Sequence, residues 1–105
     1  MATALAIPAY AHIEKTDGVR AGKACIAGTR IAVVDVAIAH QQGHSPDEIC
    51  TLFSSRPLTL AEVHAALAYH YDHPEELEGY LQRSEQLDQQ LETARAEYLR
   101  RQAGR

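Results

Sequence analysis

The chain has 105 residues, with 10 Lys and Arg against 14 Asp and Glu, which gives a formal net charge of −4 at pH 7. This length has room for one domain with a modest core. The negative excess lies entirely in residues 59–105, since residues 1–58 carry equal numbers of acidic and basic side chains. Because proteins that bind nucleic acid usually carry a basic excess, the composition argues against strong autonomous DNA binding.

The compartment indicated by the sequence is the cytoplasm. Cys25 and Cys50 are too few for a disulfide framework, and they are more typical of buried filler than of nucleophiles. The first residues lack a basic segment, and Pro8 interrupts their apolar run, so they make a poor signal peptide. No stretch has the length of a membrane span.

The chain begins with residues 1–11, which are expected to form a flexible arm. Residues 12–14 predict a short strand, followed by a turn at Asp17-Gly18. The glycines of residues 22–28 allow sharp bends. Residues 31–34 (IAVV) are rich in β-branched side chains and predict a second short strand.

Three helices are expected next. Residues 35–42 predict the first, with Gly43 ending it. Ser45 and Glu48 have the spacing of a capping box, so a second, short helix is expected to run to Phe53.

The third helix is expected over Leu60–Tyr71. Thr59 and Glu62 form another capping-box pair before it, and Pro74 starts a last helix. Residues 12–73 therefore predict a mainly α domain, a homeodomain-like helix-turn-helix with a short N-terminal β element. Residues 74–105 are expected to form a long C-terminal helix and tail.

The two faces of the third helix differ in composition. We expect its core face to hold Leu60, Val63, Leu67 and Tyr71. Its outer face would then hold Ala61, Glu62, Ala65, Ala68 and Tyr69. This outer face has no Lys or Arg, and Glu62 would repel phosphate, so it fits a major groove poorly. Ala61, Ala65, Ala68 and Tyr69 are instead expected to pack against another helix or a second subunit.

Basic residues near the glycine bends are the better candidates for DNA contact. Arg20, Lys23 and Arg30 lie there, and Arg56 lies in a later turn. Guanidinium groups and exposed backbone N–H groups could meet phosphates at such bends. For Arg30, an ion pair with Asp35 or another carboxylate that pins the turn is an equally good interpretation.

The last helix has a narrow apolar stripe on a polar background. The stripe consists of Leu77, Leu81, Leu87, Leu91, Ala94 and Tyr98. A stripe this narrow stabilises little alone, so the helix is expected to need a partner. Residues 100–105 are expected to be disordered.

Histidines and carboxylates do not form a recognisable catalytic or metal-binding pattern. Gly43 separates His40 from His44, and Pro74 ends the helix that carries His70 and His73. No nucleophile and base lie at a known spacing. The sequence therefore predicts a protein that is not an enzyme and has no metal or cofactor.

Three segments in order carry a family resemblance: AGKACIAGTRI (21–31), GHSPDEI (43–49) and LTLAEVHAALAY (58–69). Together they resemble the domain-of-unknown-function family 433. The chain departs from the family pattern at Ala21, where the family has glycine, at Ala24, where it has proline, and at Ala32, where proline is frequent.

The resemblance implies a homeodomain-like dimer with a VapB-like antitoxin role, neutralising a PIN-like nuclease toxin. DNA binding at its own operon would be an added role. The expected toxin-binding residues are Leu81, Glu85, Leu87, Asp88, Leu91 and Glu92, since acidic groups could cover a basic nuclease groove and leucines supply burial. A stand-alone DNA-binding regulator and a purely structural dimerisation module remain the alternatives.

Overall fold

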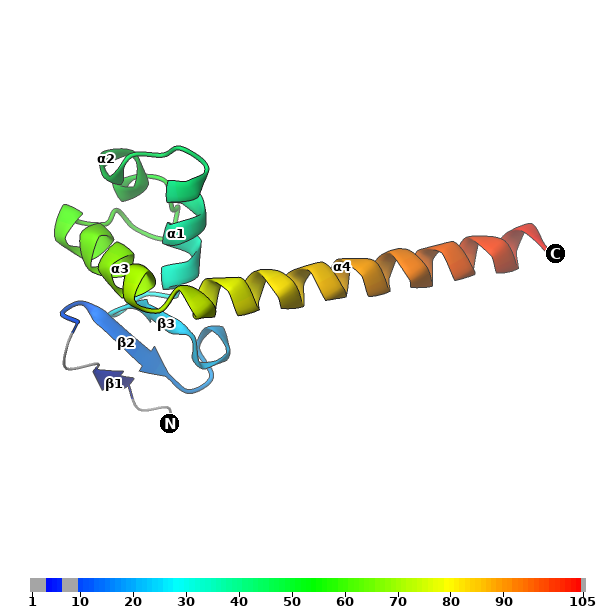
Figure 1. Ribbon diagram of the computed structural model, residues 1–105, viewed down its shortest axis with the longest axis horizontal. Helices are drawn as coiled ribbons and strands as arrows, with labels where there is room; N and C mark the ends of the chain where they lie inside the picture. Colours follow the sequence, from blue (N-terminus) through cyan, green and yellow to red (C-terminus); the bar gives the residue numbers. More distant parts are fainter. Residues whose placement is uncertain (1–3, 7–9, 105) are drawn as a thin grey trace. The chain divides into compact units, whose positions relative to one another are not determined.

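A computed structural model describes residues 4–6 and 10–104 of the chain, which divide into a first unit ending at Pro74 and a second beginning at Glu75. The strands of the first unit are β1 (Ala4–Ala6), β2 (Ile13–Thr16) and β3 (Ala24–Ile26). Its helices are α1 (Val33–Gln41), α2 (Pro46–Cys50) and α3 (Leu60–Asp72), with a 3₁₀ turn at Arg20–Gly22 (Figure 1). The second unit holds α4, whose bounds are Pro74–Ala103, so that only the first residue of this helix belongs to the first unit.

The strands form one antiparallel sheet in the order β1-β2-β3. Ile13 pairs with Ile26 across β2 and β3, and Ala4 pairs with Thr16 across β1 and β2. Ala4–Ala6 thus form a strand within the segment expected to be an arm, and the rest of residues 1–9 lies outside the described residues. The mainly α composition, the short N-terminal β element and the long C-terminal helix confirm the coarse fold prediction.

The strand predicted over residues 31–34 is wrong. Ala32 makes only an isolated bridge to Cys25, and α1 already begins at Val33. The helix can start there because Asp35 Oδ2 accepts a hydrogen bond from the Ala32 N–H at 3.0 Å. Val33 and Val34 are both buried in this helix, so burial outweighs their β preference.

The core of the first unit lies where α3 meets α1, α2 and the strands β2 and β3. Its largest fully buried side chains are Ile26, Val36, Ile49 and Val63. They come from β3, α1, α2 and α3 respectively, so each of these elements contributes an aliphatic side chain to one cluster. These elements therefore hold one another in place by burial of apolar surface.

Both predicted capping boxes are present. The Ser45 N–H donates to Glu48 Oε1 at 2.9 Å, and the Glu48 N–H donates back to Ser45 Oγ at 3.2 Å. The Thr59 N–H donates to Glu62 Oε1 at 2.9 Å, and the Glu62 N–H donates to Thr59 Oγ1 at 3.1 Å. Each pair satisfies two donors at a helix start, as the spacing predicted. The second helix ends at Cys50, before the predicted Phe53.

The predicted faces of α3 are partly wrong. Val63 and Leu67 are buried as expected, but Leu60 is 46% exposed and Tyr71 is 66% exposed. Glu62 and Tyr69, expected on the outer face, are buried instead. The Tyr69 ring centroid lies 5.0 Å from that of Tyr10, so a residue far earlier in the chain covers this side of the helix.

Helix α4 is largely exposed along its length. Its Leu77 is buried, whereas Leu81, Leu87, Leu91, Tyr98 and Leu99 are 45–60% exposed. The helix continues to Ala103, so the expected disorder of residues 100–105 is wrong for residues 100–103. Among the described residues, no helix is long and apolar enough to cross a membrane.

Candidate functional site

An open groove of about 530 Å³ lies on the first unit, between the end of β2, the turn after β3 and the loop before α3. Its lining residues are Glu14, Thr16, Val19, Gly28, Thr29, Arg30, Ser55 and Arg56. Arg30 and Arg56 are 26 positions apart in the sequence and meet here at one surface. The groove thus brings together two of the residues expected to contact DNA.

The turn after β3 presents Arg30 to solvent. Gly28 has φ +76°, and its N–H donates to Glu14 Oε1 at 3.0 Å. Thr29 Oγ1 donates to the Ile26 carbonyl at 2.8 Å and accepts from the Ile31 N–H at 3.0 Å. These bonds hold the turn closed and leave the Arg30 side chain exposed.

Arg20 holds the same turn in place through contacts with Asp35 and with the backbone of Arg30. Its Nη1 lies 2.6 Å from Asp35 Oδ2 and also donates to the Arg30 carbonyl at 3.0 Å. Asp35 therefore pairs with Arg20 rather than with Arg30, which corrects the ion pair considered for Arg30. Lys23 Nζ donates to the Arg20 carbonyl at 3.4 Å, so Lys23 lies beside this network.

Arg56 is anchored by the first turn of α3. Its Nη2 lies 2.7 Å from Glu62 Oε2, and its Nη1 donates to Glu62 Oε1 at 3.2 Å. The hydrogen bonds from Arg56 lower the pKa of Glu62 from 4.5 to about 2, against the opposing effect of burial. The same contact raises the pKa of Arg56. Glu62, expected to repel phosphate from an outer face, is thus neutralised in place by Arg56.

The four basic candidates therefore differ in their roles. Arg20 and Arg56 each hold a buried or half-buried carboxylate, whereas Arg30 extends from a turn into solvent. Glu14 also lines the groove, so the surface has mixed charge rather than a uniform positive field. Such a surface suits contact with a few phosphates better than a continuous electrostatic track.

The cysteines are buried or partly buried, and His40 and His44 lie near different partners. Cys25 is buried, and burial raises the pKa of its thiol, which opposes thiolate chemistry. Cys50 is partly buried. His40 Nδ1 lies 3.3 Å from the His44 carbonyl oxygen, and His44 Nδ1 lies 3.7 Å from Glu48 Oε2. The two rings thus have different neighbours, as expected from the Gly43 break.

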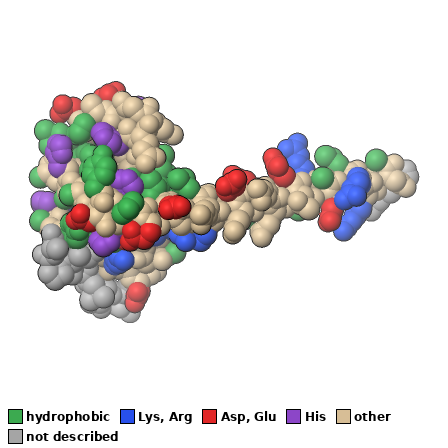
Figure 2. All heavy atoms as spheres, in the orientation of Figure 1, with side chains coloured by type: hydrophobic (Ala, Val, Ile, Leu, Met, Phe, Trp, Pro, Cys, Tyr) green, Lys and Arg blue, Asp and Glu red, His purple; other side chains and the backbone are tan. Residues whose placement is uncertain are grey.

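Helix α4 carries the residues expected to bind a toxin, and all of them are exposed. They are Leu81, Glu85, Leu87, Asp88, Leu91 and Glu92. Figure 2 shows acidic and basic side chains interspersed along this helix. Sequence reasoning did not include Glu78, which lies seven residues before Glu85 and fourteen before Glu92 and so falls in the same row as these two glutamates.

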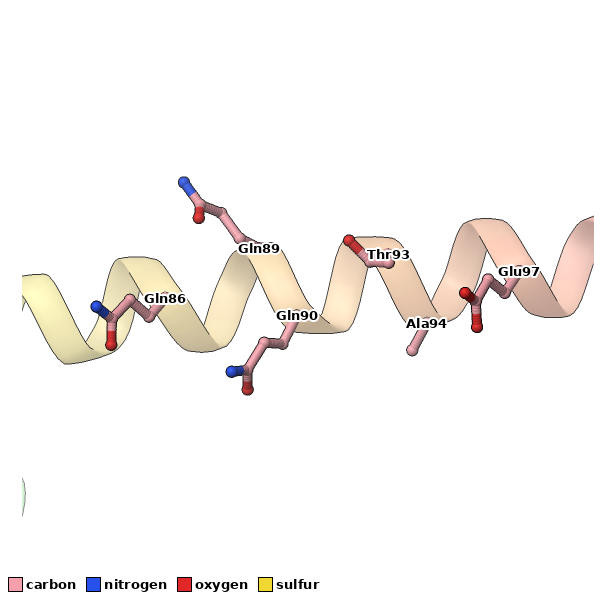
Figure 3. Close-up of a pocket in the computed structure, with 6 residues that line it drawn as sticks. All are labelled: Gln86, Gln89, Gln90, Thr93, Ala94 and Glu97. Atoms are coloured by element: carbon pink, nitrogen blue, oxygen red, sulfur yellow. The ribbon is translucent and has the colours of Figure 1, made fainter.

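Another part of the α4 surface is mainly polar, with three glutamines and one charged residue, Glu97. Gln86, Gln89, Gln90, Thr93, Ala94 and Glu97 line a shallow hollow of about 450 Å³ (Figure 3). All of these residues belong to one helix, so nothing among them encloses a small molecule. The hollow is an open depression between the side chains of one helix and not a ligand site.

The first unit is a small, mainly helical domain with a short antiparallel sheet and an arginine-bearing groove. The chain belongs to the DUF433 family, described as protein of unknown function, whose model matches residues 13–70. It is also similar to the crystal structure of a DUF433 member protein from Anabaena variabilis ATCC 29413, with 32% sequence identity and a TM-score of 0.59. This match covers 66% of each chain, and so a little under two thirds of the Anabaena protein. No curated protein matches the chain.

Proposed function

We propose that this protein is an antitoxin that binds and neutralises a PIN-like nuclease through α4. The observation that carries the proposal is the exposure of large apolar side chains on a 30-residue helix, among them Leu81, Leu87 and Leu91. Exposed leucines at helical spacing are typical of a face that lays into the groove of a partner. The family match ends at residue 70, so α4 is a feature of this chain beyond the matched domain.

The charged residues of α4 indicate which kind of surface the partner must offer. Glu78, Glu85 and Glu92 recur every seven residues on α4 and are exposed. A nuclease that cleaves RNA has a basic groove for phosphates, and a row of carboxylates can occupy such a groove by charge complementarity. In this arrangement the antitoxin itself performs no catalysis, and it acts by excluding RNA from the nuclease.

A second function, DNA binding by the first unit, is favoured by the arginine groove. We propose that α1, α2 and α3 form a homeodomain-like helix-turn-helix and that Arg30 contacts a phosphate, with Arg20 and Lys23 behind it. The exposed Arg30 and the hydroxyl group of Ser55 are the kinds of side chain that bind phosphate oxygens. Regulation of its own operon would be the consequence.

Co-expression with the neighbouring reading frames tests the antitoxin proposal. The proposal expects a nuclease to co-purify with the chain in a stable complex, and its RNA cleavage to be blocked in that complex. Truncation after Pro74 should abolish the complex, because it removes the proposed binding helix. A complex that persists without α4, or a co-purified nuclease that still cleaves RNA, contradicts the proposal.

A further inference from the structure

Helix α4 has a seven-residue repeat that its leucines alone do not show. Apolar or small residues recur at alternating intervals of three and four: Leu77, Tyr80, Ser84, Leu87, Leu91, Ala94 and Tyr98. This alternation places them at heptad positions a and d, the seam of a coiled coil. Leu87, Leu91 and Tyr98 are 55%, 59% and 60% exposed in the single chain, so their part of the seam lacks a covering surface.

The charged residues beside the seam indicate that a second copy of this helix covers it. When Leu77 is at position a, Arg83 falls at position g and Asp88 at position e. In a parallel pair of helices, each g residue faces the e residue five positions later on the other helix. Arg83 of one copy then meets Asp88 of the second copy, and symmetry makes this contact twice. Both side chains are exposed in the single chain.

The antiparallel alternative is less favourable. Setting Leu87 against Leu91 of the second copy brings Asp88 opposite Asp88, and like charges repel at that distance. Arg83 would then face Glu97, so the antiparallel pair mixes attraction with repulsion. We propose that α4 pairs in parallel with a second copy of this chain, through the seam of residues 80–98.

This inference goes beyond the proposed function and refines its residues. Glu78, Glu85 and Glu92 fall at heptad position b, away from the seam, so pairing leaves both glutamate rows available to a nuclease. Leu81 lies at position e, at the edge of the seam. In the paired form Leu87 and Leu91 contact the second copy, and the nuclease contact is then made by Leu81 and the glutamate rows. The test below uses the isolated chain, so its result is independent of any nuclease.

Sedimentation equilibrium of the full chain tests the seam. The double variant Leu87→Asp, Leu91→Asp places four unpaired charges between the helices and should weaken self-association by at least about a hundredfold. The control, Gln82→Asp with Gln89→Asp, adds the same charge at position f. Figure 3 shows Gln89 pointing to the side opposite Ala94 of the seam. A monomeric parent chain, or equal weakening by both variants, overturns the proposal.

A charge exchange tests the orientation without altering the apolar seam. Arg83→Asp should weaken the dimer about tenfold, because two exposed attractive pairs become repulsive. Adding Asp88→Arg should restore the parental affinity in a parallel dimer. In an antiparallel dimer the same double variant would set the introduced aspartate against Glu97 and the two introduced arginines against each other, so association would stay as weak as in Arg83→Asp alone. Failure of this rescue overturns the parallel arrangement.

Discussion

The guanidinium of Arg56 lies 2.7 Å from the carboxylate of Glu62, and this contact ties the loop before α3 to the first turn of that helix. Glu62 also accepts the Thr59 N–H at 2.9 Å, so one carboxylate closes the capping box and holds the arginine of the groove. The position of Arg56 in the groove therefore depends on the integrity of the helix start.

Replacement of Glu62 by Gln should make the protein less stable and less sensitive to acid. The pKa of Glu62 is lowered in the folded chain to about 2. The unfolded chain therefore binds the proton more readily, so this carboxylate stabilises the fold above about pH 4.5 and the contribution is lost as the pH falls toward about 2. Urea unfolding at about pH 7 and about pH 3 measures the difference.

The expected loss for Glu62→Gln at neutral pH is on the order of 1–3 kcal/mol, because a charge-assisted contact and part of the capping box disappear. The difference in free energy of unfolding between variant and parent should become smaller at low pH. Glu97→Gln, on an exposed stretch of α4, is the matched control and should leave the pH profile unchanged. A constant gap at both pH values would contradict the role assigned to Glu62.

Asp35→Ala should lower the free energy of unfolding by about 1–3 kcal/mol, because it removes both the partner of Arg20 and the acceptor of the Ala32 N–H. Arg30→Ala, on the same turn, should change it by less than about 0.5 kcal/mol because the side chain is exposed. Thermal unfolding of the two variants checks both values. Equal effects would show that Arg20 does not pin the turn.

Much of the helix positioning was readable from local sequence. The capping boxes at Ser45 and Thr59 depend on side chains three residues apart, so their signal is local and both predictions are confirmed. The strand prediction for residues 31–34 failed because the burial of Val33 and Val34 in α1 comes from tertiary contacts. The burial of Tyr69 depends on Tyr10, 59 residues earlier, and no local pattern reports such a distant contact.

Ala21→Gly should stabilise the protein by about 0.5–1 kcal/mol. Ala21 has φ +58°, a left-handed conformation that glycine adopts without strain, and it stands where the family pattern has glycine. Gly28→Ala should have the opposite sign and cost about 1 kcal/mol, because Gly28 has φ +76° and alanine is strained there. Tm values of the two variants decide the matter, and a destabilised Ala21→Gly protein would contradict this interpretation of the turn.

Arg30→Ala should weaken DNA binding uniformly across sequences if the groove contacts phosphate. Loss of one phosphate contact should reduce the slope of log affinity against log salt concentration by about 1. Arg95→Ala removes the same charge from α4, at a residue that does not line the groove, and serves as control. Fluorescence anisotropy at several salt concentrations measures both variants, and identical slopes would remove Arg30 from the interface.

The site was only partly predictable, for a physical reason. Sequence reasoning named Arg30 and Arg56 separately, but their meeting in one groove depends on the packing of the turn after β3 beside the loop before α3. An ion pair between Arg30 and Asp35 was one of two interpretations of Arg30, whereas in the structure Asp35 pairs with Arg20 of the 3₁₀ turn. Which arginine is anchored and which is exposed is decided by tertiary contacts.

Inhibition of the co-purified nuclease tests the central claim most directly. RNA cleavage is measured while the nuclease is titrated with the parent chain, with Glu85→Gln, Glu92→Gln, and with the control Gln82→Arg, Gln89→Arg. Both double variants change the net charge by the same amount, but only the first removes glutamates of the row, two of its three. The account predicts full inhibition by the parent and the control, and inhibition weakened about tenfold or more by the loss of two carboxylates facing a basic groove. Equal inhibition by all three proteins, or cleavage that the parent chain leaves unchanged, would contradict it.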